Sequence, residues 1–189
     1  MGKRVVITGV PGVGKTTVID GTKEKLKEEN IDYTSINFGT CMFEVACEQG
    51  KVKNRDEMRK LEQAEQKELQ KTAAQLIAKI QDNVIVDTHC TVSTPGGYLP
   101  GLPSWVLQEM KPDMVILVET DVDQILMRRM KDDTRERDME GYISIKDHQD
   151  YNRFMAAAYS MYTGCTVKII KNQDFLLEKS IEEMMGILR

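Results

Sequence analysis

The stretch Val5–Thr16, VVITGVPGVGKT, decides the fold of this chain. It begins with β-branched residues that predict a short buried strand, and a segment with apolar residues at helical spacing starts at Lys15. Between these two segments, residues 9–16 match the pattern G-x-x-x-x-G-K-[ST] at every fixed position. A strand, a glycine-rich turn and a helix in this order predict a phosphate-binding loop.

The chemistry of this loop requires these residue types. Glycines let the backbone wrap around phosphate oxygens, and the helix that follows directs unpaired N–H groups and its positive dipole end at the same anion. Lys15 can reach the β- and γ-phosphates, the Thr16 hydroxyl can ligate Mg²⁺, and Thr17 is placed near an α-phosphate. We therefore expect a nucleoside triphosphate, ATP, to bind Gly9, Val10, Pro11, Gly12, Val13, Gly14, Lys15, Thr16 and Thr17.

Strand-like and helix-like segments alternate along the rest of the chain. The strand-like segments are short and apolar without alternation, a pattern typical of a parallel sheet covered by helices on both faces. We find no internal repeat or linker, so residues 1–189 are expected to form one α/β domain of three layers, α/β/α. We expect strands at 5–7, 33–38, 84–86, 114–118 and 166–170, helices at 15–29, 39–48, 55–61, 63–81, 103–110, 121–129, 147–162 and 175–188, and a loop rich in proline and glycine before residue 103.

Composition excludes several classes of protein. The chain has 189 residues, 41% of them hydrophobic and 30% charged, and a formal net charge of −4, which disfavours general nucleic-acid binding. The four cysteines form no C-x-x-C pair, and reduced thiols together with the lack of a signal peptide predict a cytoplasmic protein. The uncharged stretch 88–108 contains three prolines, so we expect no membrane span.

The phosphate loop alone does not distinguish a kinase from a GTP-dependent switch. A switch needs a guanine-reading N-K-x-D tetrapeptide, which this sequence lacks, and the D-x-x-G at residues 138–141 follows no apolar strand. Asp87 directly follows a predicted strand, where an aspartate can hold a water on Mg²⁺, although it could also cap a turn. Thr16, directly, and Asp87, through water, are our candidates for the metal.

Several arginines are candidates for contact with the triphosphate. Arg128 and Arg135 lie on the same face of a highly charged segment, and Arg153 follows on the next predicted helix. Arginines on a movable segment can neutralise transition-state charge and exclude water, so we expect catalytic roles for Lys15, Arg128, Arg135 and Arg153. The alternative is surface ion pairing between neighbouring turns, for Arg153 with Gln149 or Asp150.

Taken together, these residues resemble the adenylate kinase family, in particular its short archaeal type. The resemblance extends over nearly the whole chain, and Asp87–His89 with the Thr94–Pro103 loop is its most distinctive part. It implies transfer of the γ-phosphoryl of ATP to AMP, giving two ADP, with Mg²⁺ as cofactor. It also implies a five-stranded parallel sheet of order 2-3-1-4-5, a nucleotide-monophosphate flap at about 38–82, a short lid at about 129–146, and a homo-oligomer, commonly a trimer. The matching segments are Gly9–Thr17, Ile36–Thr40, Arg55–Leu61, Val84–Gly101, Ile125–Asp138 and Thr163–Asn172.

The resemblance is uneven at the expected AMP site. Gly39 and Thr40 match the flap segment that faces AMP, whereas Phe43 and Thr91 occupy positions where bacterial relatives carry arginines for the AMP phosphate. We expect Arg59 with His89 to replace them, with Arg55 as a further candidate. His89 could instead be a neutral residue that caps the loop. The expected AMP contacts are therefore Gly39, Thr40, Arg59 and His89.

Two other functions share this motif set. One is a kinase for CMP, UMP or dTMP, and the other is an adenylate-kinase-like ATPase of ribosome assembly that binds RNA or a ribosomal protein. The acidic net charge argues against the second, because such proteins typically have a basic surface. The absence of a catalytic base excludes neither kinase, since a monophosphate acceptor is already ionised near neutral pH.

Overall fold

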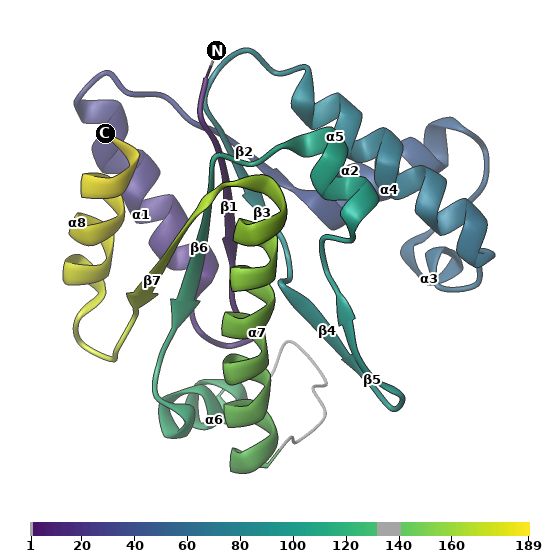
Figure 1. Ribbon diagram of the computed structural model, residues 1–189. Coiled ribbons are helices and arrows are strands. Elements are labelled where there is room, and N and C mark those ends of the chain that lie inside the picture. Colours follow the sequence, from purple (N-terminus) through teal and green to yellow (C-terminus); the bar gives the residue numbers. More distant parts are fainter. Residues whose placement is uncertain (1, 132–140) are drawn as a thin grey trace.

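The computed structural model describes residues 2–131 and 141–189 and contains a central parallel sheet. Its strand order is β2-β3-β1-β6-β7, so β1 is central and the fourth and fifth sheet strands in the chain follow on one side of it (Figure 1). This confirms the order predicted by the family resemblance. The strands are β1 (Arg4–Thr8), β2 (Thr34–Asn37), β3 (Val84–Asp87), β6 (Met114–Glu119) and β7 (Thr166–Lys171).

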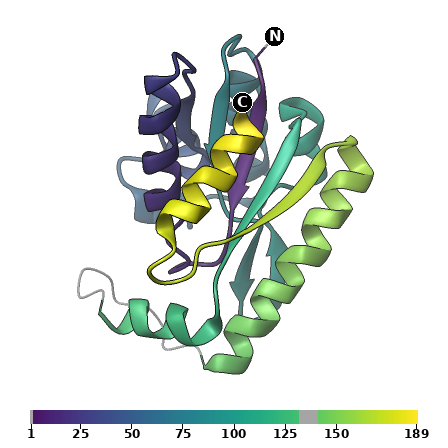
Figure 2. The ribbon, with the colours of Figure 1, turned by 90° about the vertical axis from the view of Figure 1, so that its left-hand side faces the viewer.

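Helices cover both faces of the sheet, as predicted (Figures 1 and 2). On one face α1 packs beside α8, and on the other α4, α5 and α7 contribute to the core. The shorter α6 lies beyond the carboxyl end of β6, and α2 and α3 complete the region next to β2. The helices are α1 (Lys15–Glu28), α2 (Phe38–Glu48), α3 (Arg55–Met58), α4 (Gln63–Ala78), α5 (Ser104–Met110), α6 (Val122–Met130), α7 (Tyr142–Thr163) and α8 (Leu177–Leu188).

Alternation of side chains along the buried strands explains the two layers. Successive strand residues point to opposite faces of a sheet. In β1, Val5 and Ile7 join the core under α1 and α8, while Val6 joins the core under α4, α5 and α7. Val5, Val6 and Ile7 are each at most 1% exposed, which is why this strand is an unbroken apolar run in the sequence.

The region from α2 to α4 has a small core of its own. Val45 and Ala46 of α2 pack with Val52 and with Leu69 of α4, separately from the two cores at the sheet. Other residues of the same segment, Phe38 of α2 and Ala73 and Ile77 of α4, belong to the core at the sheet, so the flap at about 38–82 and its movement remain predictions. The predicted lid at about 129–146 falls largely outside the described residues.

Two expectations about secondary structure were wrong. The segment after β3 is not only a loop, because β4 (Thr91–Thr94) and β5 (Gly97–Pro100) form an antiparallel hairpin. Its turn uses the very residues that suggested a loop: Gly97 has a φ of +117°, and the Thr94 hydroxyl donates to the Gly97 carbonyl at 2.7 Å. Helix α7 also begins at Tyr142, before the predicted 147, because Ile145 is fully buried and anchors its first turns.

The β4–β5 hairpin is attached to α7. Tyr98 of the hairpin stacks on Tyr151 of α7 with ring centroids 4.7 Å apart. Thr91 donates from its hydroxyl to Asn152 Oδ1 at 2.6 Å, at a buried position. These contacts hold the hairpin at the carboxyl end of the sheet, where it forms one wall of the site described next. Of the helices in the described parts of the chain, none has both the length and the apolar character needed to cross a membrane.

Candidate active site

The phosphate loop connects β1 to α1 at the carboxyl end of the sheet, and its glycines are required by geometry. A Cβ at Gly9 would lie 2.3 Å from the Val118 carbonyl oxygen, so only glycine allows the loop to pass this close to β6. Gly14 has a φ of +82° and caps α1 without a side chain. The loop therefore leaves the first N–H groups of α1 available to an anion, as the motif predicted.

Three side chains hold the carbonyl groups of this loop from outside. Asn172 donates from Nδ2 to the Val13 carbonyl at 2.8 Å, and Arg128 donates to the same oxygen at 3.0 Å. Arg129 donates from Nε to the Pro11 carbonyl at 2.9 Å. Because a peptide group is planar and trans, a carbonyl held on one side directs the next N–H to the other side. These bonds thus orient the N–H groups of Gly12 and Gly14.

Lys15 is paired with Asp87. The Lys15 Nζ atom lies 2.5 Å from Asp87 Oδ1, and both side chains are mostly buried, with exposed fractions of 14% and 19%. Asn37 donates to the other carboxylate oxygen of Asp87 at 3.2 Å. Asp87 ends β3 in register with Ile7 of β1, so the parallel sheet brings it to the loop. The structure therefore joins the two residues that the sequence assigned to phosphate and metal.

The oxygen atoms near the loop are suited to Mg²⁺. This cation prefers oxygen ligands and usually binds through one or two protein groups together with substrate phosphates. Thr16 carries its hydroxyl on the exposed first turn of α1, and Asp87 supplies a carboxylate at the neighbouring strand end. The residues present fit the expected ion.

A cleft of about 490 Å³ extends from Lys15 and Asp87. It passes between the α2–α4 region on one side and the β4–β5 hairpin on the other. Of the predicted AMP contacts, Gly39 and His89 line it, and Thr40 lies beside Gly39 at the start of α2. The lining residues are Lys15, Asn37, Phe38, Gly39, Met42, Arg55, Gln66, Gln70, Asp87, Thr88, His89, Val92, Leu99, Pro100 and Gly101.

Arg55, rather than Arg59, is the arginine that lines the cleft. Its Nη2 donates to the Thr40 hydroxyl at 2.7 Å, and its guanidinium lies 5.3 Å from the centre of the Phe43 ring. Phe43 stands where bacterial relatives carry an arginine, and its ring supports Arg55 through a cation–π contact. Arg59 is the C-cap of the short helix α3 and is exposed, outside the residues that line the cleft.

The environment of His89 favours the neutral imidazole. Partial removal of the ring from water lowers the pKa of His89, and the nearby Lys15 cation lowers it further. Asp87 acts in the opposite direction but more weakly. A neutral ring can still donate a hydrogen bond from one nitrogen, so the shift is compatible with the predicted contact to AMP and with the alternative of a neutral loop residue.

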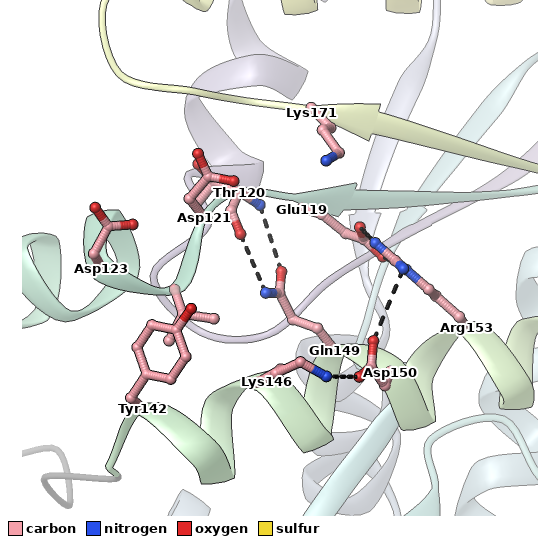
Figure 3. Close-up of a pocket in the computed structure, with 11 residues that line it drawn as sticks. Glu119, Thr120, Asp121, Asp123, Tyr142, Lys146, Gln149, Asp150, Arg153 and Lys171 are labelled. Atoms are coloured by element: carbon pink, nitrogen blue, oxygen red, sulfur yellow. Dashed lines mark hydrogen bonds and ion pairs between the residues drawn. The ribbon is translucent and has the colours of Figure 1, made fainter.

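The remaining predicted arginines fall into different surroundings. Arg128 contacts the loop, as described, and also pairs with Asp174 at 2.5 Å. Arg153 forms a two-pronged ion pair with Glu119, at 2.7 and 2.5 Å, which the sequence did not suggest (Figure 3). It also forms a longer ion pair with Asp150, at 3.8 Å, which is one of the two surface contacts considered from the sequence. Arg135 lies outside the described residues.

Arg153 and Glu119 belong to a second cavity, of about 510 Å³, between α6, α7 and the ends of β6 and β7 (Figure 3). Beside the ion pair, the Gln149 amide bonds to Thr120 in both directions: it donates to the carbonyl at 3.1 Å and accepts from the N–H at 3.4 Å. Together these bonds attach α7 to the end of β6. Nearer the start of α7, Ile145 belongs to the same core cluster as Val10 and Val13 of the phosphate loop.

Sequence reasoning missed two residues of this arrangement, Asn172 and Glu119, and ranked a third, Arg55, too low. Asn172 orients the loop, Glu119 holds Arg153, and Arg55 was considered only after Arg59. A signal for the first two existed, because both lie at the carboxyl ends of predicted strands, where open parallel sheets bind their ligands. The motif itself gives no indication of them.

Comparison with known proteins agrees with this geometry. The chain is 58% identical to an adenylate kinase of Methanoculleus marisnigri over the full length of both proteins. It is 54% identical to that of Methanocaldococcus jannaschii, covering 99% of this chain and 98% of the relative, and 50% identical to that of Methanothermobacter thermautotrophicus, covering 98% and 99%. This chain belongs to the adenylate kinase family.

One family model and two solved structures also resemble this chain. Residues 8–146 match the model of the AAA domain family, which includes the phosphate loop. A shikimate kinase from Bacteroides thetaiotaomicron has a similar structure, with a TM-score of 0.55 over 98% of each chain and 14% identity. A sugar kinase from Janibacter has a TM-score of 0.53 over 98% of this chain and 94% of its own, again at 14% identity. At this identity the likeness shows the α/β fold alone.

Proposed function

We propose that the loop and the cleft are the donor and acceptor sites of an ATP:AMP phosphotransferase, the activity of the adenylate kinase family. The observation that carries this assignment is the position of Lys15. It opens the helix behind the phosphate loop and also lines the cleft that contains Arg55 and His89. A triphosphate in the loop would therefore present its terminal phosphate to a monophosphate in the cleft.

On the donor side, the loop residues 9–14 grip the triphosphate with their N–H groups, and Lys15 neutralises the β- and γ-phosphates. The outward bonds from Asn172, Arg128 and Arg129 support this role, because they preorganise the N–H groups before ATP arrives. Lys15 then exchanges Asp87 for phosphate oxygens. Thr16 and Asp87 would hold Mg²⁺, which supplies positive charge that neutralises the phosphate oxygens during transfer.

On the acceptor side, Arg55 binds the phosphate of AMP, with Gly39, Thr40 and His89 around it. Its support is the orientation fixed by the Thr40 hydroxyl and the Phe43 ring. An arginine presents a planar fork of donors that matches phosphate oxygens. Arg59 lies at the C-cap of α3, and its contact with AMP remains a prediction.

The reaction needs no general base. The acceptor oxygen of AMP is already ionised near neutral pH, so this chain contributes alignment, charge and exclusion of water. Arg128 and Arg153 are the described candidates for neutralising transition-state charge, and Arg153 would have to leave Glu119 to do so. The role of Arg135 remains a prediction.

The test is an assay of ADP formation from MgATP with AMP, CMP, UMP, dTMP or GMP as acceptor, alongside a reaction with water alone. We expect AMP to give the highest kcat/KM. Activity with a different monophosphate would move the chain to another kinase class. If no monophosphate raised ADP formation above hydrolysis, the phosphotransferase proposal would be rejected.

We also propose that the chain forms a homo-oligomer, as its family resemblance implied. Its support is an exposed stripe on α7, where Phe154 is 72% and Met161 is 88% exposed, and Ala157 and Ala158 between them allow close approach of a second copy. Sedimentation equilibrium would test this, and a monomer at micromolar concentration would contradict it. A trimer, a cytoplasmic location and the lack of nucleic-acid binding stay predictions.

A further inference from the structure

Helix α4 presents two glutamines to the acceptor cleft. Gln66 and Gln70 are half-buried, one helical turn apart, and both line the cleft on the side of α4. Residues spaced in this way lie on one face of a helix, so the two amide groups can reach the same ligand. The same cleft is lined by apolar residues such as Met42 and Leu99, which can pack against the base of a nucleotide.

Each amide is held in one orientation by a partner with a single hydrogen-bonding role. The Gln66 Nε2 atom donates to the Leu61 carbonyl at 2.8 Å, and a carbonyl can only accept. The Gln70 Oε1 atom accepts from the Trp105 Nε1 atom at 2.8 Å, and an indole N–H can only donate. These partners prevent the two amides from turning over without losing a bond.

The fixed orientations leave complementary atoms for a ligand. Gln66 keeps its Oε1 acceptor, and Gln70 keeps the N–H donors of its Nε2 atom. Within the described parts of the chain, neither of these two atoms has a protein partner. The cleft wall therefore offers one acceptor beside one donor.

We propose that Gln66 and Gln70 select the base of the monophosphate, and that they select a 6-aminopurine over bases with a carbonyl at the same place. This inference rests on the proposed function of the cleft as the AMP site. The amino group of adenine donates to Gln66, and the adjacent ring nitrogen accepts from Gln70. In the same pose guanine or uracil opposes an oxygen to Gln66 Oε1 and an N–H to the Gln70 amide, so both contacts become repulsive.

The critical experiment is Gln70→Glu. The carboxylate has the same shape and can keep the bond from Trp105, but its second oxygen accepts instead of donating. We expect kcat/KM for AMP to fall by about 10- to 100-fold relative to that for GMP, while the KM for ATP is unchanged. Gln75→Glu makes the same change of charge at an exposed position of α4 and serves as the matched control. A Gln70→Glu enzyme with the wild-type ratio of AMP to GMP would overturn the inference.

A second variant, Trp105→Phe, tests the orientation of Gln70 and keeps an aromatic ring in place. Without the indole N–H, the Gln70 amide can turn over, so we expect discrimination between AMP and GMP to decrease with kcat for AMP less affected. Calorimetric titration of AMP and CMP gives an independent readout. CMP shares the amino-and-nitrogen edge, so we expect Gln70→Glu to weaken its binding too.

The outcomes separate the two proposals. A wild-type chain inactive with every monophosphate rejects the proposed function. An active wild-type chain together with an unchanged base preference in Gln70→Glu rejects only the role of these glutamines. Thermal unfolding of each variant shows whether it folds. If one of the two variants does not fold, the base preference of the other tests the role of the glutamines.

Discussion

Lys15 Nζ and Asp87 Oδ1 lie 2.5 Å apart although 72 positions separate the two residues in the sequence. The pair joins the helix after the phosphate loop to the end of the neighbouring strand β3. In the absence of phosphate, Asp87 provides the counter-charge for a lysine that would otherwise be buried without one. Binding of a triphosphate thus replaces one anionic partner of Lys15 by another.

The first prediction concerns Lys15. Lys15→Ala should lower kcat by at least ~10²-fold, because it removes a charge that acts chiefly on the transition state. The fold should persist, since Asn37 still donates to Asp87. Lys27→Ala, at an exposed position of α1, is the control. ADP formation and circular dichroism measure both effects, and near-normal turnover of Lys15→Ala would contradict its role.

Asn172 is the subject of the second prediction. Asn172→Ala removes the donor to the Val13 carbonyl, so the Gly14 N–H is held less firmly and ATP should bind about 5- to 30-fold more weakly, corresponding to ~1–2 kcal/mol. Calorimetry with ATP measures the change, and the affinity for AMP should change less. Gln173→Ala, whose amide bonds to Asp121 instead of the loop, serves for comparison. Equal ATP affinity in wild type and Asn172→Ala would show that Arg128 alone suffices.

The third prediction distinguishes two arginines of the flap region. Arg55→Ala should raise the KM for AMP by roughly 10- to 100-fold through loss of a charged hydrogen bond, with a smaller effect on the KM for ATP. Arg59→Ala should have the weaker effect, because Arg59 does not line the cleft. Steady-state kinetics with each substrate varied in turn provide the comparison. The reverse ranking would restore the role of Arg59 expected from the sequence.

The fourth prediction separates a catalytic from a structural role of Arg153. Glu119 is almost fully buried, so Arg153→Ala leaves its carboxylate unpaired and should lower the free energy of unfolding by ~1–3 kcal/mol. Adding Glu119→Gln removes the unpaired charge and should recover most of this loss. If Arg153 acts on phosphates, kcat stays low in the double variant. Recovery of kcat together with stability would assign Arg153 to structure.

The fifth prediction is a pH dependence from His89. The pKa of His89 is lower in the folded chain than the value of about 6.5 in the unfolded chain. At pH values between these two, the unfolded chain therefore binds more protons than the folded chain. The contribution of His89 to the free energy of unfolding is fully present above the pKa of the unfolded state. It is lost as the pH falls through the pKa of the folded state. Urea unfolding at about pH 7.5 and about pH 5.5 should show a larger loss in wild type than in His89→Gln. Wild type and His89→Gln both contain His148, so its titration does not contribute to the difference between them. An equal loss of stability in the two proteins would show that His89 is not the source of the pH dependence.

Much of the fold could be predicted from the sequence. The order of the parallel sheet and the family are confirmed, and most elements lie within a few residues of their predicted bounds. The hairpin was missed because Pro95 and its neighbouring glycines were interpreted as a loop, whereas they form the turn between β4 and β5. The start of α7 was missed because burial of Ile145 depends on the sheet beneath it.

The sequence by itself determined the phosphate loop. Its conformation depends on glycines at fixed spacing between a strand and a helix, and all of these are local properties of one short segment. Such properties can be read without knowledge of the rest of the chain.

Only the tertiary structure decided which side chains complete the site. Asn172 reaches Val13 across 159 positions of sequence, and Arg55 rather than Arg59 enters the cleft because α3 packs against α2 through Phe43. The orientations of Gln66 and Gln70 likewise depend on partners outside α4. These contacts follow from the packing of distant elements, whose relative positions no local pattern specifies.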